Sequence, residues 1–323
     1  MFSTIDHPVL RIRSAISVCL LLACCLPYSI VDQSAGAEAL RVGDAPLAIP
    51  TFHSLGLYWS PAGGAAGKEV LVRYRCQGEL TWSEALPMRY NPIPNTDEDV
   101  ADYRGSIVHL NPATTYEIQL TLADTSKIAN VIATTWCEDF PIGESVKVTD
   151  RDTPLSITES GTPQSYRLYD GSKATIDVQH RHDNCITIDA SYVIIRGLTI
   201  KGAGAVDNTS SRPIGAIVVT GGHDIIIEDC DISDWGRRDP ETGFGFNYES
   251  AIYSRCPTLE KLVIQRCKLH HPTFDGSTWY EPVHPTHTKG PQCISLFNAG
   301  GNHVIRYNEC WSDQEHYFND GMG

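Results

Sequence analysis

Basic residues are scarce in this sequence. The chain of 323 residues has 25 Lys and Arg against 39 Asp and Glu, which gives a formal net charge of −14. A surplus of negative charge disfavours nucleic acid and anionic membranes as partners, because both repel it. Beyond the first forty residues, the sequence also lacks any apolar run long enough to span a membrane. We therefore expect no nucleic acid partner and no membrane span.

Signals for a bound metal are missing as well. The sequence has no Cys-x-x-Cys pair and no spacing of Cys and His that is typical of a zinc site. Four histidines lie between residues 270 and 287, but they match no known catalytic zinc motif. We therefore expect surface or packing roles for these histidines, with metal binding as the alternative, and assign no metal ligands.

The N-terminal residues are typical of an export signal. Arg11 and Arg13 precede an apolar stretch from residue 16 to 26, and small residues follow, ending Ala35-Gly36-Ala37. A basic start, a short apolar core and an Ala-x-Ala site define a secretory signal peptide. We predict removal of residues 1–37 and a secreted, cell-surface or periplasmic protein. The alternative is a lipoprotein cleaved before Cys24, since residues 21–24 resemble a lipoprotein box.

Residues 44–137 are predicted to form a small β-sandwich. Short runs alternate apolar and polar residues and are separated by Gly, Pro and Asn, as in segments 55–59, 70–75, 106–110 and 116–120. This pattern indicates antiparallel strands with one buried face. Residues 110–120 fit the pattern L-x-P-x-T-x-Y-x-I-x-L, which resembles the signature of the fibronectin type III family. That resemblance implies a corner in which Tyr116 bonds to upstream backbone, and a core position for Trp59.

A repeat occupies the rest of the chain, from about residue 150 to 323. Four units each contain three short apolar runs, and two polar residues separate the second run from the third. One such unit cannot bury its apolar side alone, so stacked parallel coils are expected. Three interior ladders follow: Leu198, Cys230, Cys267 and Cys310; Ile195, Ile227, Ile264 and Tyr307; Ile186, Ile217, Ile252 and Ile294.

The cysteines fit this repeat. Eight of the eleven lie beyond the predicted signal peptide. A free cysteine behaves as a small apolar side chain, and in-register stacking holds neighbouring Cβ atoms too far apart for easy bridging. We therefore expect Cys185, Cys230, Cys267 and Cys293 to fill ladder positions, with a disulfide between neighbouring coils as the alternative.

The repeat resembles the right-handed parallel β-helix of the pectate-lyase-like superfamily. The resemblance covers residues 150–323 and rests on architecture, because the short bend lies between the second and third strands. It implies an all-β fold, with a sandwich followed by a solenoid. The chain ends at Gly323 without a capping coil, although solenoids need capped ends. We therefore expect a fragment of a longer gene product.

Long segments follow the third run of the units, at residues 201–215, 233–250 and 270–292. Loops on one edge of a solenoid form the wall of a groove. Aromatic rings stack on sugar faces, and Arg and Lys pair with carboxylates or sulfates. We predict a polysaccharide groove with substrate-binding residues Asp189, Trp235, Glu249, Trp279 and Tyr280.

The preferred chemistry is β-elimination on an acidic polysaccharide. A polysaccharide lyase needs a cation that neutralises a uronate carboxylate and a base that removes the adjacent proton. Arg255 and Lys289 are candidates for the neutralising role, in which calcium is a candidate cofactor. His271, His287 and Tyr253 are candidates for the base.

Other functions stay open on the sequence alone. A glycoside hydrolase needs two facing carboxylates, and Asp189, Glu249 and Asp320 are the nearest candidates, with no distinctive spacing. A non-catalytic glycan-binding or surface protein fits the absence of a catalytic motif. A scaffold for other proteins ranks last, because no feature selects for it.

Overall fold

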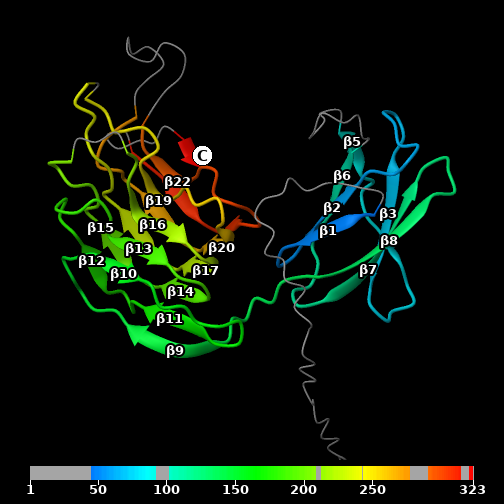
Figure 1. Ribbon diagram of the computed structural model, residues 1–323, viewed down its shortest axis with the longest axis horizontal. Helices are drawn as coiled ribbons and strands as arrows, with labels where there is room; N and C mark the ends of the chain where they lie inside the picture. Colours follow the sequence, from blue (N-terminus) through cyan, green and yellow to red (C-terminus); the bar gives the residue numbers. More distant parts are fainter. Residues whose placement is uncertain are drawn as a thin grey trace, which may run out of the picture. The chain divides into compact units, whose positions relative to one another are not determined.

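The computed structural model describes residues 45–91, 102–208, 212–241, 243–276 and 290–313, and the backbone of 320–322 (Figure 1). The regular elements within these ranges are all β-strands. None of the described residues forms a helix that is long and apolar enough to cross a membrane. The predicted signal peptide, residues 1–37, lies outside the described residues.

The first strands form two antiparallel sheets of four strands each. One contains, in spatial order, β1 (Leu47–Pro50), β2 (Leu55–Trp59), β6 (Asp102–Ile107) and β5 (Arg89–Asn91). The other contains β4 (Ser83–Glu84), β3 (Val70–Cys76), β7 (Thr115–Leu122) and β8 (Ile128–Thr134). Buried side chains from both sheets share one core, so the predicted sandwich of antiparallel strands is confirmed.

Alternation along the strands produces this core. Every second residue of β7 is buried, because successive side chains of a strand point to opposite faces. Trp59 is fully buried on β2, and Tyr116 is buried on β7. The backbone N–H of Asn111 donates a hydrogen bond of 2.9 Å to the Tyr116 hydroxyl. The predicted tyrosine corner is therefore present.

The remaining strands form three parallel sheets. The first sheet contains β10 (Leu155–Ile157), β13 (Ile186–Asp189), β16 (Gly215–Gly221), β19 (Ser250–Ser254), β22 (Gln292–Leu296) and β25 (Asp320–Met322). The second contains β9 (Ile142–Lys147), β11 (Tyr166–Asp170), β14 (Val193–Arg196), β17 (His223–Glu228), β20 (Glu260–Gln265) and β23 (Val304–Arg306). The third contains β12 (Thr175–Asp177), β15 (Thr199–Lys201), β18 (Asp231–Ser233), β21 (Lys268–His270) and β24 (Glu309–Trp311).

Successive strands go to successive sheets, so the chain winds as a β-solenoid. Equivalent strands lie side by side in parallel, as Figure 1 shows for β13, β16, β19 and β22. The predicted ladder of Ile186, Ile217, Ile252 and Ile294 is confirmed by the register of the first sheet. The four cysteines expected in the interior, at 185, 230, 267 and 293, are buried free thiols.

The other two predicted ladders are correct through three coils and wrong in the fourth. Ile264 stands opposite Ile305, and Leu269 stands opposite Cys310. Tyr307 is therefore at the bend, where its φ of 59° matches the 54° of Arg266 one coil earlier. The prediction aligned Cys310 with Cys267, but Cys310 is exposed and lies two residues further along.

Asn308, and not Cys310, stands at the position of Cys267 in the fourth coil. It follows the bend and holds the preceding coil with both ends of its amide. The Cys267 backbone N–H donates to its Oδ1 at 2.9 Å, and its Nδ2 donates to the Ile264 carbonyl oxygen at 2.9 Å. A polar side chain thus takes the position that a cysteine fills in two earlier coils.

The sequence indicated strands near residues 155–158 and 174–178, which the structure completes into a coil, whereas an apolar outer row was not predicted. β10, β11 and β12 form a complete coil before the first predicted unit. On the second sheet, an outward row of Leu168, Ile194, Ile226 and Val263 is buried. These residues belong to a cluster with Tyr166, whose ring lies 5.5 Å from that of Phe140. The second sheet is therefore apolar on both faces.

Adjacent residues of β21 test the direction of the side chains. Leu269 is fully buried in the solenoid core, whereas Lys268 is exposed. We expect Leu269→Ala to lower the free energy of unfolding by about 2–5 kcal/mol. Lys268→Ala should change it by no more than about 0.5 kcal/mol. Chemical denaturation followed by circular dichroism measures both, and equal effects would contradict the alternation of β21.

Candidate functional site

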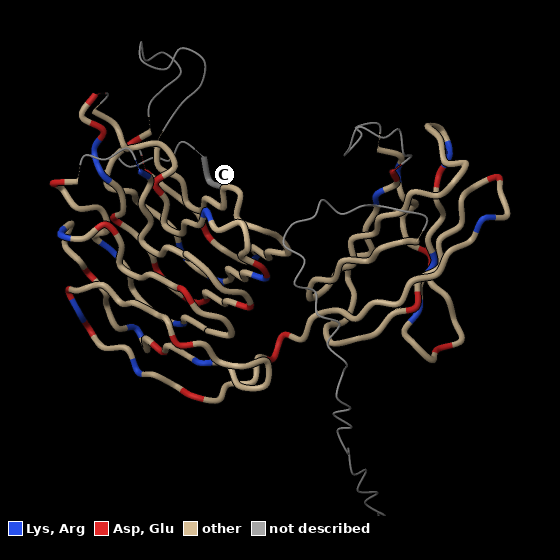
Figure 2. The backbone as a smooth tube through the Cα atoms, viewed as in Figure 1, with Lys and Arg blue, Asp and Glu red and all other residues tan. Residues whose placement is uncertain are grey.

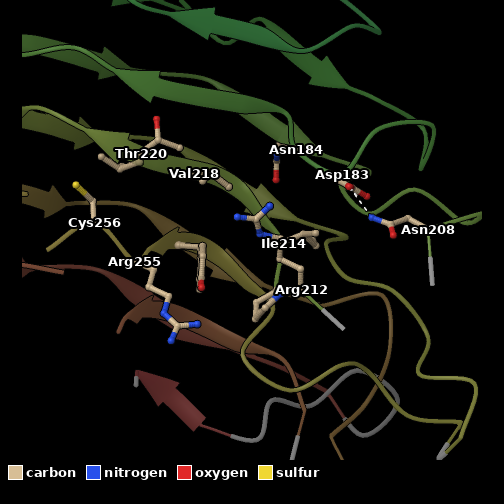
Figure 3. A pocket seen from close by; sticks show the side chains of 12 residues that line it. Asp183, Asn184, Asn208, Arg212, Ile214, Val218, Thr220, Arg255 and Cys256 are labelled. Carbon is tan, nitrogen blue, oxygen red and sulfur yellow. Dashed lines mark hydrogen bonds between the residues drawn. The ribbon is translucent and has the colours of Figure 1, made fainter. Parts of the chain in front are cut away.

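A groove of about 510 Å³ lies over the outer face of the first sheet (Figure 3). Thr220 and Cys256 lie toward one end, and Asp183, Asn184 and Asn208 toward the other. The lining residues come from β16 and β19, from the segments that precede β13 and β16, and from the end of β19. They are Asp183, Asn184, Asn208, Arg212, Pro213, Ile214, Val218, Val219, Thr220, Tyr253, Arg255 and Cys256.

The register of the first sheet sets the floor of this groove. Val218 of β16 stands opposite Tyr253 of β19. The neighbours of Tyr253 in the chain, Ile252 and Ser254, are both buried. Because side chains alternate along a strand, Tyr253 projects outward while Ile252 joins the interior ladder. The same alternation that builds the core therefore presents a phenol ring to the groove.

Two arginines give the groove a positive character. Arg212 and Arg255 are exposed, and the ion pairs of the described residues involve neither guanidinium group. The Arg255 guanidinium carbon lies 5.1 Å from the ring centre of Phe297, which orients it by a cation–π contact. Elsewhere on the solenoid, acidic and basic residues are interspersed (Figure 2). Two exposed arginines that form no ion pair within the described residues are thus a local feature of an acidic chain.

One carboxylate, Asp183, lies among the described lining residues. Its two oxygens accept hydrogen bonds from the Asn208 side-chain amide at 2.6 Å and from the Ala205 backbone N–H at 3.2 Å. These bonds hold the carboxylate at the wall of the groove. A facing pair of carboxylates, as a glycoside hydrolase requires, is not present among the lining residues that the structure describes.

A buried ion pair supports the wall from beneath. Glu249 is fully buried and accepts hydrogen bonds from the Arg237 backbone N–H at 2.6 Å and from its Nε at 2.7 Å. The Arg237 Nη1 and Nη2 atoms donate to the backbone carbonyl oxygens of Asn208 at 3.0 Å and Arg212 at 2.7 Å. Arg237 therefore ties two segments that carry groove side chains to the loop after β18.

Two of the predicted catalytic residues meet in the groove, and one does not. Tyr253 and Arg255 both line it. His271 is absent from the lining, because it follows β21 and so belongs to the third sheet. The predicted His287 and Lys289 lie outside the described residues.

The predicted substrate-binding residues are dispersed. Asp189 is exposed at the end of β13, in register with Gly221, and is not among the lining residues. Trp235 and Glu249 are fully buried, so in this structure neither side chain is open to a ligand and both have a packing role. Trp279 and Tyr280 lie outside the described residues, as does the side chain of Asp320.

Arg212, Asn208 and Asp183 are site residues that the sequence did not single out. They lie just before a first-sheet strand or in the segment leading to it. Arg212 and Pro213 come directly before an apolar run. That position was the feature of the sequence from which Arg212 could have been predicted. The prediction looked instead at the longer loops that follow the third strands.

The structure supplies no calcium cage among the described side chains. No group of three or more His, Cys, Asp or Glu side chains in these ranges is arranged to hold a metal ion. Calcium takes six to eight oxygen ligands, which include backbone carbonyl oxygens and water as well as carboxylates. The arginines are the cations that the described groove offers to an anionic ligand.

Glu249 should make the stability of the protein depend on pH. Burial raises the pKa of its carboxyl group to about 7 from 4.5, against the lowering effect of Arg237. The folded protein therefore holds this proton more tightly than the unfolded chain does. The contribution of the protonated Glu249 to the free energy of unfolding is complete below pH 4.5 and is lost as the pH rises to about 7. Relative to Glu249→Gln, the wild type should lose about 3 kcal/mol across this window. Urea denaturation at both ends of the window measures the difference, and parallel pH profiles would contradict it.

Comparisons with known proteins add no family to this description. No protein-family model matches the chain, and no curated protein matches it. Its function is therefore argued from the groove itself.

Proposed function

We propose that the groove over β16 and β19 binds an acidic polysaccharide. The observation that carries this is the pair of exposed arginines, Arg212 and Arg255, beside the outward ring of Tyr253. Guanidinium groups bind carboxylates and sulfates in a bidentate manner. A tyrosine ring offers an apolar face to a sugar and a polar hydroxyl at its edge.

We further propose that the bound chain is cleaved by β-elimination. Arg212 and Arg255 pair with the carboxylate of a uronate unit, which makes the proton on the adjacent carbon easier to remove. Tyr253, in its phenolate form, is the candidate among the lining residues to take that proton. The electron pair left on carbon forms a double bond, and the bond from the next carbon to the bridging oxygen breaks. The departing oxygen then takes up a proton.

Hydrolysis is the weaker enzymatic alternative, because Asp183 is the single carboxylate among the described lining residues. Binding without cleavage is the stronger alternative. The described lining contains no His and no Lys, so Tyr253 stands without a second proton-transfer group of these types. A glycan-binding protein would use the same arginines and leave the polysaccharide intact.

We also propose a specific fold type for the solenoid and for the sandwich. For the solenoid, we propose a right-handed helix of the pectate-lyase-like type, supported by three sheets and by the short bend between the second and third. For the sandwich, we propose a fibronectin type III-like domain, supported by the bond between Asn111 and Tyr116. Export rests on the signal-like residues 1–37.

The test is an incubation of the purified protein with uronate-bearing polysaccharides, with and without calcium. Ultraviolet absorbance reports unsaturated ends, and sedimentation of the polysaccharide reports binding. Arg212→Ala and Arg255→Ala should each weaken binding about tenfold or more, because each removes a charge-assisted contact. Tyr253→Phe should abolish the absorbance rise and retain binding.

Lys173→Ala is the matched control, since Lys173 is an exposed cation outside the groove. It should leave both readouts at the wild-type level. Binding with intact polysaccharide would replace the lyase with a glycan-binding function. Folded protein that neither binds nor cleaves any member of the panel would overturn both.

A further inference from the structure

A pair of adjacent histidines stands at the end of β21, on the third sheet and outside the groove. The Nδ1 atoms of His270 and His271 lie 2.6 Å apart. Their ring planes are nearly perpendicular, at 87°, with centroids 4.8 Å apart. Two ring nitrogens therefore point at one another, which is an unusual contact that needs a chemical cause.

The opposite nitrogen of each ring faces a carboxylate. The His270 Nε2 lies 2.9 Å from an oxygen of Asp231, and the His271 Nε2 lies 3.3 Å from an oxygen of Asp313. An ionised carboxylate only accepts hydrogen bonds, so the hydrogen-bonded Nε2 of His270 carries the hydrogen, and the nearby Asp313 carboxylate favours the same tautomer in His271. In the neutral rings, each Nδ1 then holds a lone pair. The two lone pairs face each other and repel unless a proton or a metal cation stands between them.

The surroundings hold this arrangement in place. Trp311 stacks on His270 with centroids 4.3 Å apart and planes within 18°. The His271 backbone has a φ of 48°, and its carbonyl oxygen accepts a hydrogen bond of 2.8 Å from the Asp234 N–H. The side chains of His270 and His271 are 17% and 37% exposed. The site is thus fixed on its inner side and open to solvent.

We propose that His270 and His271 bind a divalent d-block cation such as Zn²⁺ through their Nδ1 atoms. Imidazole nitrogen is a preferred ligand of zinc, copper and nickel. Histidines that ligate a metal commonly donate their other N–H to a carboxylate, which orients the ring and raises its basicity. Asp231 and Asp313 occupy that position, one for each ring.

Distance and charge both suit a metal. Zinc–nitrogen bonds of about 2.0–2.1 Å at a tetrahedral angle place two ligand nitrogens about 3.3 Å apart. The observed 2.6 Å requires the two rings to separate by less than 1 Å. The two carboxylates and one divalent cation together carry no net charge. Solvent completes the coordination, because the pair supplies two protein ligands and no larger cluster exists among the described side chains.

Calorimetric titration of the full metal-free chain, made without a histidine tag, with Zn²⁺ tests this site. We expect one ion per chain bound at this site. His271→Ala should weaken binding at least tenfold, and Asp231→Asn about tenfold, as loss of a carboxylate that orients a ligand does elsewhere. His223→Ala is the control, since its ring also contacts a carboxylate, Asp224 at 2.8 Å, but has no second histidine beside it.

Circular dichroism and thermal melting establish that each variant is folded. Long-range ¹H–¹⁵N spectra of the wild-type imidazoles give a readout that needs no variant, because Zn²⁺ should shift the Nδ1 resonances of two histidines and leave their Nε2 atoms protonated. Absence of Zn²⁺ binding, binding unchanged in folded His271→Ala, or spectra showing a proton shared between the Nδ1 atoms at saturating Zn²⁺ would each overturn the site.

Discussion

Burial in this solenoid is shared between coils. A single coil has three short strands and cannot enclose its own apolar side chains, so every interior residue depends on the equivalent residue in the next coil. The parallel register enforces that dependence, as when Ile217 lies between Ile186 and Ile252. A slip of one residue would turn each buried side chain outward. The register therefore determines the core and the outer surface together.

The strand register places some of the groove side chains, and segments between the strands place the others. Tyr253 is placed by strand alternation, which the repeat imposes. Arg212 is placed by a segment between strands, whose backbone is bound by Arg237. Arg237 is in turn held by Glu249, the residue immediately before strand β19. A buried charge pair thus connects an irregular loop to the regular part of the fold.

The sequence predicted the repeated strands and their interior residues, but it did not predict contacts made by the irregular loops. The sheet of first strands, the free interior cysteines and the tyrosine corner all follow from local patterns that recur or have a defined spacing. The fourth coil was misaligned because a cysteine was assumed to mark the same position in every unit, whereas Asn308 takes that place through its hydrogen bonds. Tyr253 and Arg255 were predictable from alternation. The pairing of Arg237 with Glu249 was not, because nothing in their spacing indicates a contact across a loop.

The buried thiols have a chemical consequence. Burial raises the pKa of Cys185 to about 12, and a hydrogen bond with Cys230 together with burial raises the pKa of Cys267. The thiolate is the form that attacks disulfides and oxidants, so these sulfurs are unreactive while the coils are stacked. They regain ordinary reactivity only when a coil opens. In an oxidising compartment the folded solenoid would protect these buried cysteines from oxidation, and each unfolding event would expose them to disulfide cross-linking.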